Sequence, residues 1–214
     1  KKTPSEAFTL YGDFGCETKK NTIFKAYKAL CKAGFEKKLT PFFQAHHVHV
    51  EKRIPEFAGL GGGSSDAASF MLLCNEILDL ALCKEALSAI GEQVGADVPF
   101  FISEQPSANV TGIGEIVIPY DEKVPSFEIA TRKSRGSTQE VFKAFREHYW
   151  ERIDTQLAKK MLEMSSEELC HKYKASVLND LFLPAIYCHP SLEKYLDEGW
   201  MMSGSGSTMF RQKL

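Results

Sequence analysis

The spacing of apolar residues along the chain predicts a mixture of helices and strands. Behind Asn21, apolar residues recur three and four positions apart, which predicts an amphipathic helix with Asn21 as its N-cap and Gly34 as its stop. Residues 47–54 begin with an alternation of polar and apolar side chains and predict a strand. The apolar run at residues 67–80 predicts a helix. A strand, a glycine-rich loop and a helix therefore follow one another in the first half of the chain.

Shorter elements follow in an irregular order. Apolar spacing and capping residues predict further helices at about residues 84–94, 137–149, 165–173 and 190–197. Short strands are predicted within residues 107–120 and at residues 127–131, and a small-residue loop between apolar segments lies within residues 200–210. This irregular alternation favours an α+β fold in two halves, divided near residues 123–126.

The composition is that of an ordinary globular protein. Of the 214 residues, 43% are hydrophobic and 25% are charged, and this balance excludes collagenous and intrinsically disordered chains. No apolar window reaches the roughly 18 residues that a membrane span needs, and the first residues contain no signal-like apolar stretch. The six cysteines are scattered without a Cys-x-x-Cys pair, which favours reduced thiols. We therefore expect a cytoplasmic protein that does not bind a membrane.

The net charge of −2 conceals an uneven distribution of charged residues. Residues 1–55 carry 11 Lys and Arg against 5 Asp and Glu, residues 56–130 carry 2 against 12, and residues 131–214 carry 13 against 11. The isoelectric point is near 6.3, whereas nucleic-acid-binding proteins usually have a sustained basic surface. Nucleic acid is therefore not expected as a partner.

The strongest chemical signal is the glycine-rich loop at residues 59–65. Three successive glycines, Gly61 to Gly63, carry no Cβ, so that backbone amides can approach a ligand closely. A helix that opens at Ser64 or Ser65 directs its N–H groups and the positive end of its dipole at the same place. Because the surrounding segment is acidic, the loop predicts an anion site held mostly by backbone groups and by a metal ion.

Spacing excludes two familiar phosphate-binding motifs. The pattern G-x-G-x-x-G, started at Gly59, requires a glycine where the chain has Ser64, and started at Gly61 it meets Asp66. The P-loop pattern requires Gly-Lys-Ser/Thr, and no lysine follows these glycines. A tight turn without a ligand is the alternative, although the capping run Ser64-Ser65-Asp66 fixes a helix start directly behind the loop.

Three further features each leave two interpretations open. Asp97 is flanked by apolar residues, and such a carboxylate is either a catalytic group or a capping or turn-forming residue. The segment Gly204 to Thr208 is either a ligand loop or a plain turn. His46, His47 and His49 form a dense cluster, but their alternation with apolar residues favours a solvated strand face over a metal site.

Taken together, four stretches resemble the GHMP kinase superfamily and, within it, the family of 4-diphosphocytidyl-2-C-methyl-D-erythritol kinases. They occur in the family's order, at Lys52 through Ala68, Gly95 through Phe101, Asn179 to Leu181 and Met202 through Thr208. The resemblance spans most of the chain. It implies an N-terminal half like ribosomal protein S5 domain 2 and a ferredoxin-like C-terminal half, with ATP and substrate in the cleft between them.

The resemblance also implies a reaction and the residues that perform it. ATP, with Mg²⁺, donates its γ-phosphoryl group to the 2-hydroxyl of the methylerythritol unit in the non-mevalonate route to isoprenoid precursors, and Asp97 is the catalytic base. The implied ATP-binding residues are Asn21, Lys52, Pro55, Glu56, Phe57, Ala58, Gly59, Leu60, Gly61, Gly62, Gly63, Ser64 and Ser65. The implied substrate-binding residues are Ser137, Thr138, Gly204, Ser205, Gly206 and Ser207, the last four from a motif beside the phosphates. Ser65 is a candidate metal contact, and no acidic Mg²⁺ ligand is identified.

The chain departs from the family at its start. The family opens with a strand carrying Pro-Ala-Lys, whose lysine pairs with the catalytic aspartate, and Lys1-Lys2-Thr3-Pro4 does not match it. Residues 1–124 are therefore expected to form the ATP-binding N-terminal domain without its first strands, and residues 125–214 the C-terminal domain. Another GHMP kinase, of the homoserine or mevalonate type, and a nucleotide-binding relative without catalysis are the alternatives. A monomer or a weak homodimer is expected.

Overall fold

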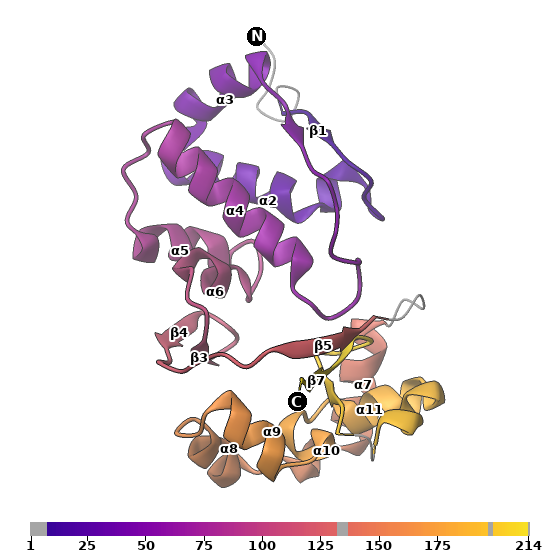
Figure 1. Ribbon diagram of the computed structural model, residues 1–214. Coiled ribbons are helices and arrows are strands. Elements are labelled where there is room, and N and C mark those ends of the chain that lie inside the picture. Colours follow the sequence, from indigo (N-terminus) through magenta and orange to yellow (C-terminus); the bar gives the residue numbers. More distant parts are fainter. Residues whose placement is uncertain (1–7, 132–136, 197–198, 214) are drawn as a thin grey trace. The chain divides into compact units, whose positions relative to one another are not determined.

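The structure is a computed structural model that describes residues 8–131, 137–196 and 199–213. Its internal contacts divide the chain into two units: Lys1–Ile54 with Gly61–Tyr120, and Pro55–Leu60 with Asp121–Leu214. Each unit combines helices with short strands (Figure 1), which confirms the predicted α+β class. The assignment of residues 1–124 and 125–214 to an N-terminal and a C-terminal domain stays a prediction.

The first unit is mainly helical. Its helices and helical turns are η1 (Thr18–Lys20), α2 (Thr22–Leu30), η2 (Cys31–Phe35), α3 (Glu36–Ala45), α4 (Gly62–Ile77), α5 (Lys84–Glu92) and α6 (Val98–Ser103). Its strands form a parallel pair and an antiparallel hairpin, which are β1 (Leu10–Tyr11) with β2 (Val48–His49) and β3 (Ala108–Thr111) with β4 (Ile116–Pro119). Helix α4 packs against both α2 and α6 and is the longest ribbon of this unit in Figure 1.

Aromatic rings form the centre of the core of the first unit. Phe8 stacks on Tyr27 of α2 with ring centroids 4.5 Å apart, and its edge meets Phe43 of α3 and Phe70 of α4 at 5.1 and 5.6 Å. Tyr27 is completely buried, and its burial raises the pKa of its hydroxyl to about 12. Each buried aromatic ring removes a large apolar area from water, so such rings contribute strongly to the stability of a core. The cluster therefore joins three helices, one of which begins at the glycine-rich loop.

The second unit is built on a three-stranded antiparallel sheet. The strand order is β5 (Phe127–Ala130), β7 (Met209–Gln212) and β6 (Met201–Met202). Its helices and helical turns are α7 (Thr138–His148), η3 (Trp150–Arg152), α8 (Thr155–Met161), α9 (Ser166–Lys172), α10 (Ala175–Leu178), α11 (Phe182–Cys188) and η4 (Pro190–Tyr195). Val141, Phe182, Leu192 and Met209 are fully buried in its core. The predicted small-residue loop thus connects β6 to β7.

Several predicted elements differ from those in the structure. The strand expected over residues 47–54 is reduced to β2, because it pairs with a β1 of only two residues. The helix expected over residues 190–197 is the 3₁₀ turn η4, which ends at Tyr195, and the last predicted position lies outside the described residues. Helix α3 was not predicted. It contains Pro41, which locally disfavours a helix, and the burial of Leu39 and Phe43 outweighs that cost.

Other local predictions are confirmed. Gly34 interrupts the helix at the predicted place, with φ of 104°. Asn21 caps α2, and Ser137 caps α7 by accepting a hydrogen bond from Glu140 N. Within the described ranges, no helix is long and apolar enough to cross a membrane.

The thiols provide a test of the packing around α4. All six cysteines are free; Cys74 of α4 is buried, whereas Cys16 and Cys83 are exposed. Burial raises the pKa of the Cys74 thiol to about 12, so the reactive thiolate is scarce at neutral pH. We expect iodoacetamide at pH 8 to alkylate Cys16 and Cys83 in the native protein well before Cys74, as followed by peptide mass spectrometry. In guanidinium chloride the three should react alike. Equal native rates for Cys74 and Cys83 would contradict the described packing.

Candidate functional site

The glycine-rich loop continues directly into the first turn of α4. Gly61 is the N-cap residue, in the left-handed conformation with φ of 65°, and the helix begins at Gly62. The predicted start at Ser64 or Ser65 is therefore two or three residues late, because the glycines themselves adopt the first helical turn. The first helical hydrogen bond runs from Ser65 N to Gly61 O at 2.9 Å. The N–H groups of Gly62, Gly63 and Ser64 thus have no acceptor within the helix, which is the geometry of an anion site.

Close packing also requires glycines in this turn. A Cβ on Gly61 would lie 2.9 Å from the ring of Phe101. A Cβ on Gly62 would lie 2.9 Å from Cγ2 of Ile54. Either substitution would push neighbouring side chains out of place, so the shape of the turn depends on its packing as well as on any ligand.

Two polar contacts hold the same turn. Thr22 Oγ1 donates a hydrogen bond of 2.7 Å to Gly63 O. Lys52 Nζ pairs with Asp66 Oδ2 at 2.5 Å, and the lysine side chain is only 12% exposed. The Lys52 ammonium also lies 3.6 Å from the position of a Cβ on Gly62. Sequence reasoning treated Asp66 as a capping residue, whereas its carboxylate is the partner that holds a predicted ATP-binding lysine beside the helix N-terminus.

Asn21 lies close to this turn along the chain. It precedes Thr22, which contacts the turn, and it is 6% exposed. Its Oδ1 accepts a hydrogen bond of 2.9 Å from Ile23 N. The side-chain oxygen of Asn21 is thus engaged in capping α2. The implied ATP contact of Asn21 stays a prediction.

Asp97 lies in the turn between α5 and α6. It occupies the N-cap position of α6 but makes no capping hydrogen bond, and its side chain is exposed, so capping does not explain this carboxylate. A Cβ on Gly95 would lie 3.8 Å from Ser64 Oγ, which brings the Asp97 turn next to the first turn of α4. A Cβ on Gly114 would lie 2.6 Å from Ala96 O, so the β3–β4 hairpin packs tightly against the same turn.

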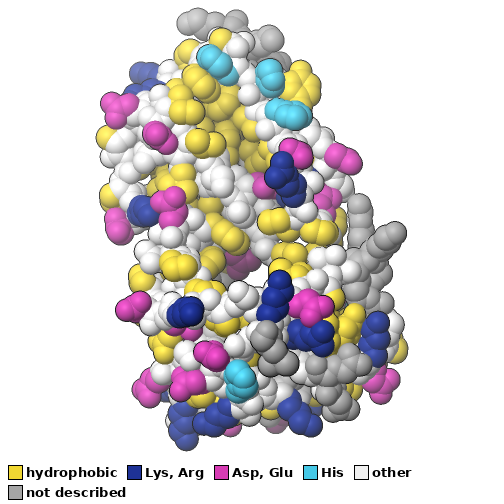
Figure 2. All heavy atoms as spheres, in the orientation of Figure 1, with side chains coloured by type: hydrophobic (Ala, Val, Ile, Leu, Met, Phe, Trp, Pro, Cys, Tyr) yellow, Lys and Arg dark blue, Asp and Glu magenta, His cyan; other side chains and the backbone are white. Residues whose placement is uncertain are grey.

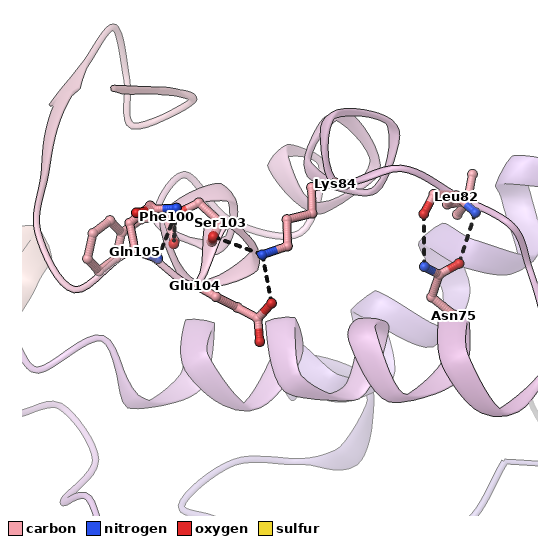
Figure 3. A network of polar contacts seen from close by, with 7 residues as sticks. All are labelled: Asn75, Leu82, Lys84, Phe100, Ser103, Glu104 and Gln105. Atoms are coloured by element: carbon pink, nitrogen blue, oxygen red, sulfur yellow. Dashed lines mark hydrogen bonds and ion pairs between the residues drawn. The ribbon is translucent and has the colours of Figure 1, made fainter. Parts of the chain in front are cut away.

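Helix α6, which follows Asp97, is held at its carboxyl end and packs closely against α5. At its carboxyl end, Lys84 Nζ donates to Ser103 O at 3.1 Å and pairs with the Glu104 carboxylate at 2.7 Å (Figure 3). Along its length, a Cβ on Gly91 of α5 would lie 2.8 Å from Val98, so the two helices approach closely. These contacts fix the helix that determines where Asp97 stands.

In the second unit, the first half of the glycine-rich loop contacts the loop between β6 and β7. Ser203 Oγ donates a hydrogen bond of 2.7 Å to Gly59 O. Thr208 N donates one of 3.1 Å to Ala58 O. A Cβ on Gly59 would overlap Ser203 O and lie 2.7 Å from Gly206 O. Two of the predicted motifs, far apart in the sequence, are therefore in direct contact.

The predicted substrate-binding residues also come together in this unit. Ser137 caps α7 and accepts a hydrogen bond of 3.3 Å from Glu140 N. The next residue, Thr138, has its Oγ1 2.9 Å from Ser205 Oγ. Gly204 is exposed, whereas Gly206 and Ser207 are buried. The hydroxyl groups of Thr138 and Ser205 thus form a hydrogen-bonded pair that joins two segments of the chain.

The remaining predicted ATP-binding residues lie in the segment before Gly61. Pro55 and Phe57 are exposed, Glu56 and Leu60 are half-buried, and Ala58 is buried. Phe57 has φ of 55°, a left-handed conformation that non-glycine residues seldom adopt and that is found disproportionately at functional sites.

The described residues contain no group of three or more His, Cys, Asp or Glu placed to hold a metal ion.

The histidines that follow α3 contact aromatic rings. His46 stacks on Phe42 with ring centroids 4.1 Å apart, and the ring of His47 meets that of Tyr11 edge-on at 5.1 Å. These histidines border an apolar groove of about 470 Å³ lined by α3, β2 and α4. In Figure 2 histidine side chains lie beside the hydrophobic surface in the upper part of the view.

Several known proteins are similar to this chain. Residues 21–105 match the family described as GHMP kinases N terminal domain. The 4-diphosphocytidyl-2-C-methyl-D-erythritol kinase of Sulfurimonas denitrificans is 43% identical over 215 residues, covering 99% of this chain and 81% of the relative. The enzyme of the same name from Helicobacter pylori is 37% identical over 217 residues, covering 97% of this chain and 78% of the relative.

A solved structure is similar as well. A crystal structure of 4-(cytidine 5'-diphospho)-2C-methyl-D-erythritol kinase matches with a TM-score of 0.67 at 30% identity, covering 96% of this chain and 72% of that one. The alignments therefore extend well beyond the motifs, over nearly the whole length of the chain.

The contact between Gly59 and the β6–β7 loop can be tested with two glycines of similar conformation. Gly59 has φ of 73° and Gly199 has φ of 69°, but a Cβ on Gly199 would meet nothing within 4 Å. Gly199→Ala should therefore cost only the left-handed backbone strain, about 1–2 kcal/mol. Gly59→Ala should cost at least about 1 kcal/mol more, because backbone oxygens must move. Urea unfolding of both variants measures this difference. Equal costs would contradict the close approach.

Proposed function

Because the chain belongs to the 4-diphosphocytidyl-2-C-methyl-D-erythritol kinase family of the GHMP kinases, we propose that it transfers the γ-phosphoryl group of ATP to the 2-hydroxyl of 4-diphosphocytidyl-2-C-methyl-D-erythritol. This reaction belongs to the non-mevalonate route to isoprenoid precursors. The observation that carries the proposal is 43% identity over 99% of the chain to a relative of that name. A homoserine or mevalonate type of kinase, or a non-catalytic nucleotide binder, is not favoured, since the relatives share one description.

The triphosphate of ATP is assigned to the first turn of α4. Phosphoryl transfer requires charge neutralisation and in-line positioning more than covalent chemistry. No P-loop lysine is needed here. The hydrogen-bond donors are the N–H groups of Gly62, Gly63 and Ser64, and the positive end of the helix dipole supplies a positive electrostatic potential. Lys52, held beside this turn by Asp66, adds a positive charge. The arrangement supports binding of an anion with several phosphate oxygens.

Mg²⁺ enters this proposal as part of the MgATP substrate. Mg²⁺ at nucleotide sites commonly keeps several waters and phosphate oxygens, with one or two protein groups as further ligands. The residues present fit that arrangement, because the hydroxyls of Ser64 and Ser65 stand in the first turn of α4. Ser65 is the residue proposed to contact the ion. When bound, the ion neutralises charge on the phosphates.

Asp97 is proposed as the catalytic base. A general base needs a carboxylate that is free to accept the proton of the attacking hydroxyl. Asp97 meets this condition, because its side chain is exposed and makes no capping hydrogen bond. The close approaches at Gly95 and Gly114 restrict the movement of its turn, which supports a fixed orientation toward the hydroxyl. The carboxylate accepts the hydroxyl proton as the oxygen attacks the γ-phosphorus and the bond to ADP breaks.

The substrate is proposed to contact Ser137, Thr138 and the residues Gly204 to Ser207. The contact between Thr138 and Ser205 supports this assignment, because it brings donors from two segments to one place. The expectations of a cytoplasmic location and of a monomer or weak homodimer stay predictions.

The substrate assignment is tested by a coupled ADP-release assay of the full-length protein. ATP and Mg²⁺ are supplied with 4-diphosphocytidyl-2-C-methyl-D-erythritol, homoserine or mevalonate in parallel. We expect turnover with the cytidylyl substrate alone. Turnover with another alcohol instead, or ATP binding without turnover of any of the three, would overturn the proposal.

The role of Asp97 predicts a separation between binding and turnover. Asp97→Asn should lower kcat by about two to four orders of magnitude, the usual contribution of a general base, while the Kd for ATP stays within about twofold of wild type. The matched control is Asp121→Asn, which removes another exposed carboxylate and should change neither value. Steady-state kinetics and calorimetric ATP titration measure both. Near-normal kcat in Asp97→Asn would remove this residue from the mechanism.

A further inference from the structure

Asn179 follows α10, and its side-chain amide is engaged on both sides. Its Nδ2 donates hydrogen bonds of 2.9 Å to Met202 O and 2.8 Å to Gly204 O. Its Oδ1 accepts one of 2.9 Å from Leu181 N. An amide group has two N–H donors, and here both point at the backbone of the β6–β7 loop. One planar group therefore sets the spacing of two carbonyl groups of that loop.

The loop held by Asn179 is the one that holds the glycine-rich loop. Ser203 stands between the two carbonyl groups that Asn179 binds, and its hydroxyl donates to Gly59 O. The loop is closed by hydrogen bonds from Gly206 N to Ser203 O at 2.9 Å and from Ser203 N to Thr208 O at 3.0 Å. All of these residues belong to the second unit. A continuous series of contacts thus connects Asn179 to Gly59.

We propose that Asn179 is a positioning residue for ATP, which it does not touch itself. By fixing the carbonyls of Met202 and Gly204, it orients Ser203 so that the hydroxyl of Ser203 holds Gly59 in place. This inference rests on the proposed function, in which the segment before Gly61 contacts ATP. It gives a role to a stretch that sequence reasoning matched to the family without assigning any residue of it to the site.

The physical effect is preorganisation of the glycine-rich loop. A loop rich in glycine and serine has many conformations of similar energy, and a ligand that needs one of them must bear the cost of ordering it. Asn179 and Ser203 bear part of that cost before ATP arrives. Their loss should therefore weaken ATP binding more than it slows turnover at saturating ATP, because Asp97 stands on other elements.

The test uses Asn179→Asp and Asn179→Ala in the full-length protein. Aspartate has the same shape and keeps the acceptor for Leu181 N, but it places an oxygen against two carbonyl oxygens. We expect KM and Kd for ATP to rise about tenfold or more in both variants, the size of effect expected from losing two hydrogen bonds, with a smaller fall in kcat. Circular dichroism and thermal unfolding report whether each variant folds.

Asn75 provides a matched control (Figure 3). Its Nδ2 donates to Leu82 O at 2.9 Å and its Oδ1 accepts from Leu82 N at 3.0 Å, so it is a similar amide clamp on a turn after α4. Asn75→Asp should lower Tm while leaving KM for ATP unchanged. If the Asn179 variants lower Tm and also leave KM and Kd for ATP unchanged, Asn179 is only a structural clamp and the proposal is wrong.

Ser203→Ala covers the case in which the Asn179 variants fail to fold. It removes the hydrogen bond to Gly59 and should raise Kd for ATP, with no effect if the proposal is wrong. Where both residues can be changed, Ser203→Ala in an Asn179→Ala background should add little, because the two act in series. The direct ATP titration separates a failure of the role proposed for Asn179 from a failure of the proposed kinase function. Absence of turnover in the wild type refutes the proposed function, whereas an unchanged Kd for ATP in the variants refutes only the role of Asn179.

Discussion

Close approach between backbone segments at the glycine-rich loop is the constraint on which the rest of the site depends. At Gly59 the backbone meets Ser203 O and Gly206 O at distances that leave no room for a Cβ. At Gly61 the left-handed backbone starts α4 and leaves the N–H groups of its first turn without helical acceptors. Gly59 therefore fixes the packing of its segment against the β6–β7 loop, and Gly61 fixes the start of α4, because a side chain fits at neither position.

In each unit, single polar side chains hold turns in place. Asn179 and Asn75 each bind two or more backbone groups of a turn, and Lys84 binds the end of α6. The Lys52–Asp66 pair works differently, since it is only partly exposed and fixes a charge beside a helix N-terminus. Because these contacts satisfy backbone groups or partly buried charges, removing one partner costs more than removing an ordinary surface ion pair. The protein thus keeps its loops in place without disulfide bonds.

The sequence predicted the α+β class, the caps at Asn21 and Ser137, the break at Gly34 and the order of loop and helix at α4. Each of these depends on residues that are neighbours in the chain. It did not predict α3, because Pro41 disfavours a helix locally and only the buried Leu39 and Phe43 show that the helix forms. It also placed the start of α4 two or three residues late, since serine and aspartate resemble caps more than glycine does.

For the site, the sequence alone predicted which segments carry the chemistry, since the triple glycine, the aspartate at position 97 between apolar residues and the Gly-Ser loop are properties of short stretches. Tertiary structure decided which of them meet. Ser203 reaches Gly59 across a separation of 144 residues, and Asn179 reaches Gly204 across 25. Such contacts depend on how helices and strands bury their apolar faces, and no local spacing of residues encodes that outcome.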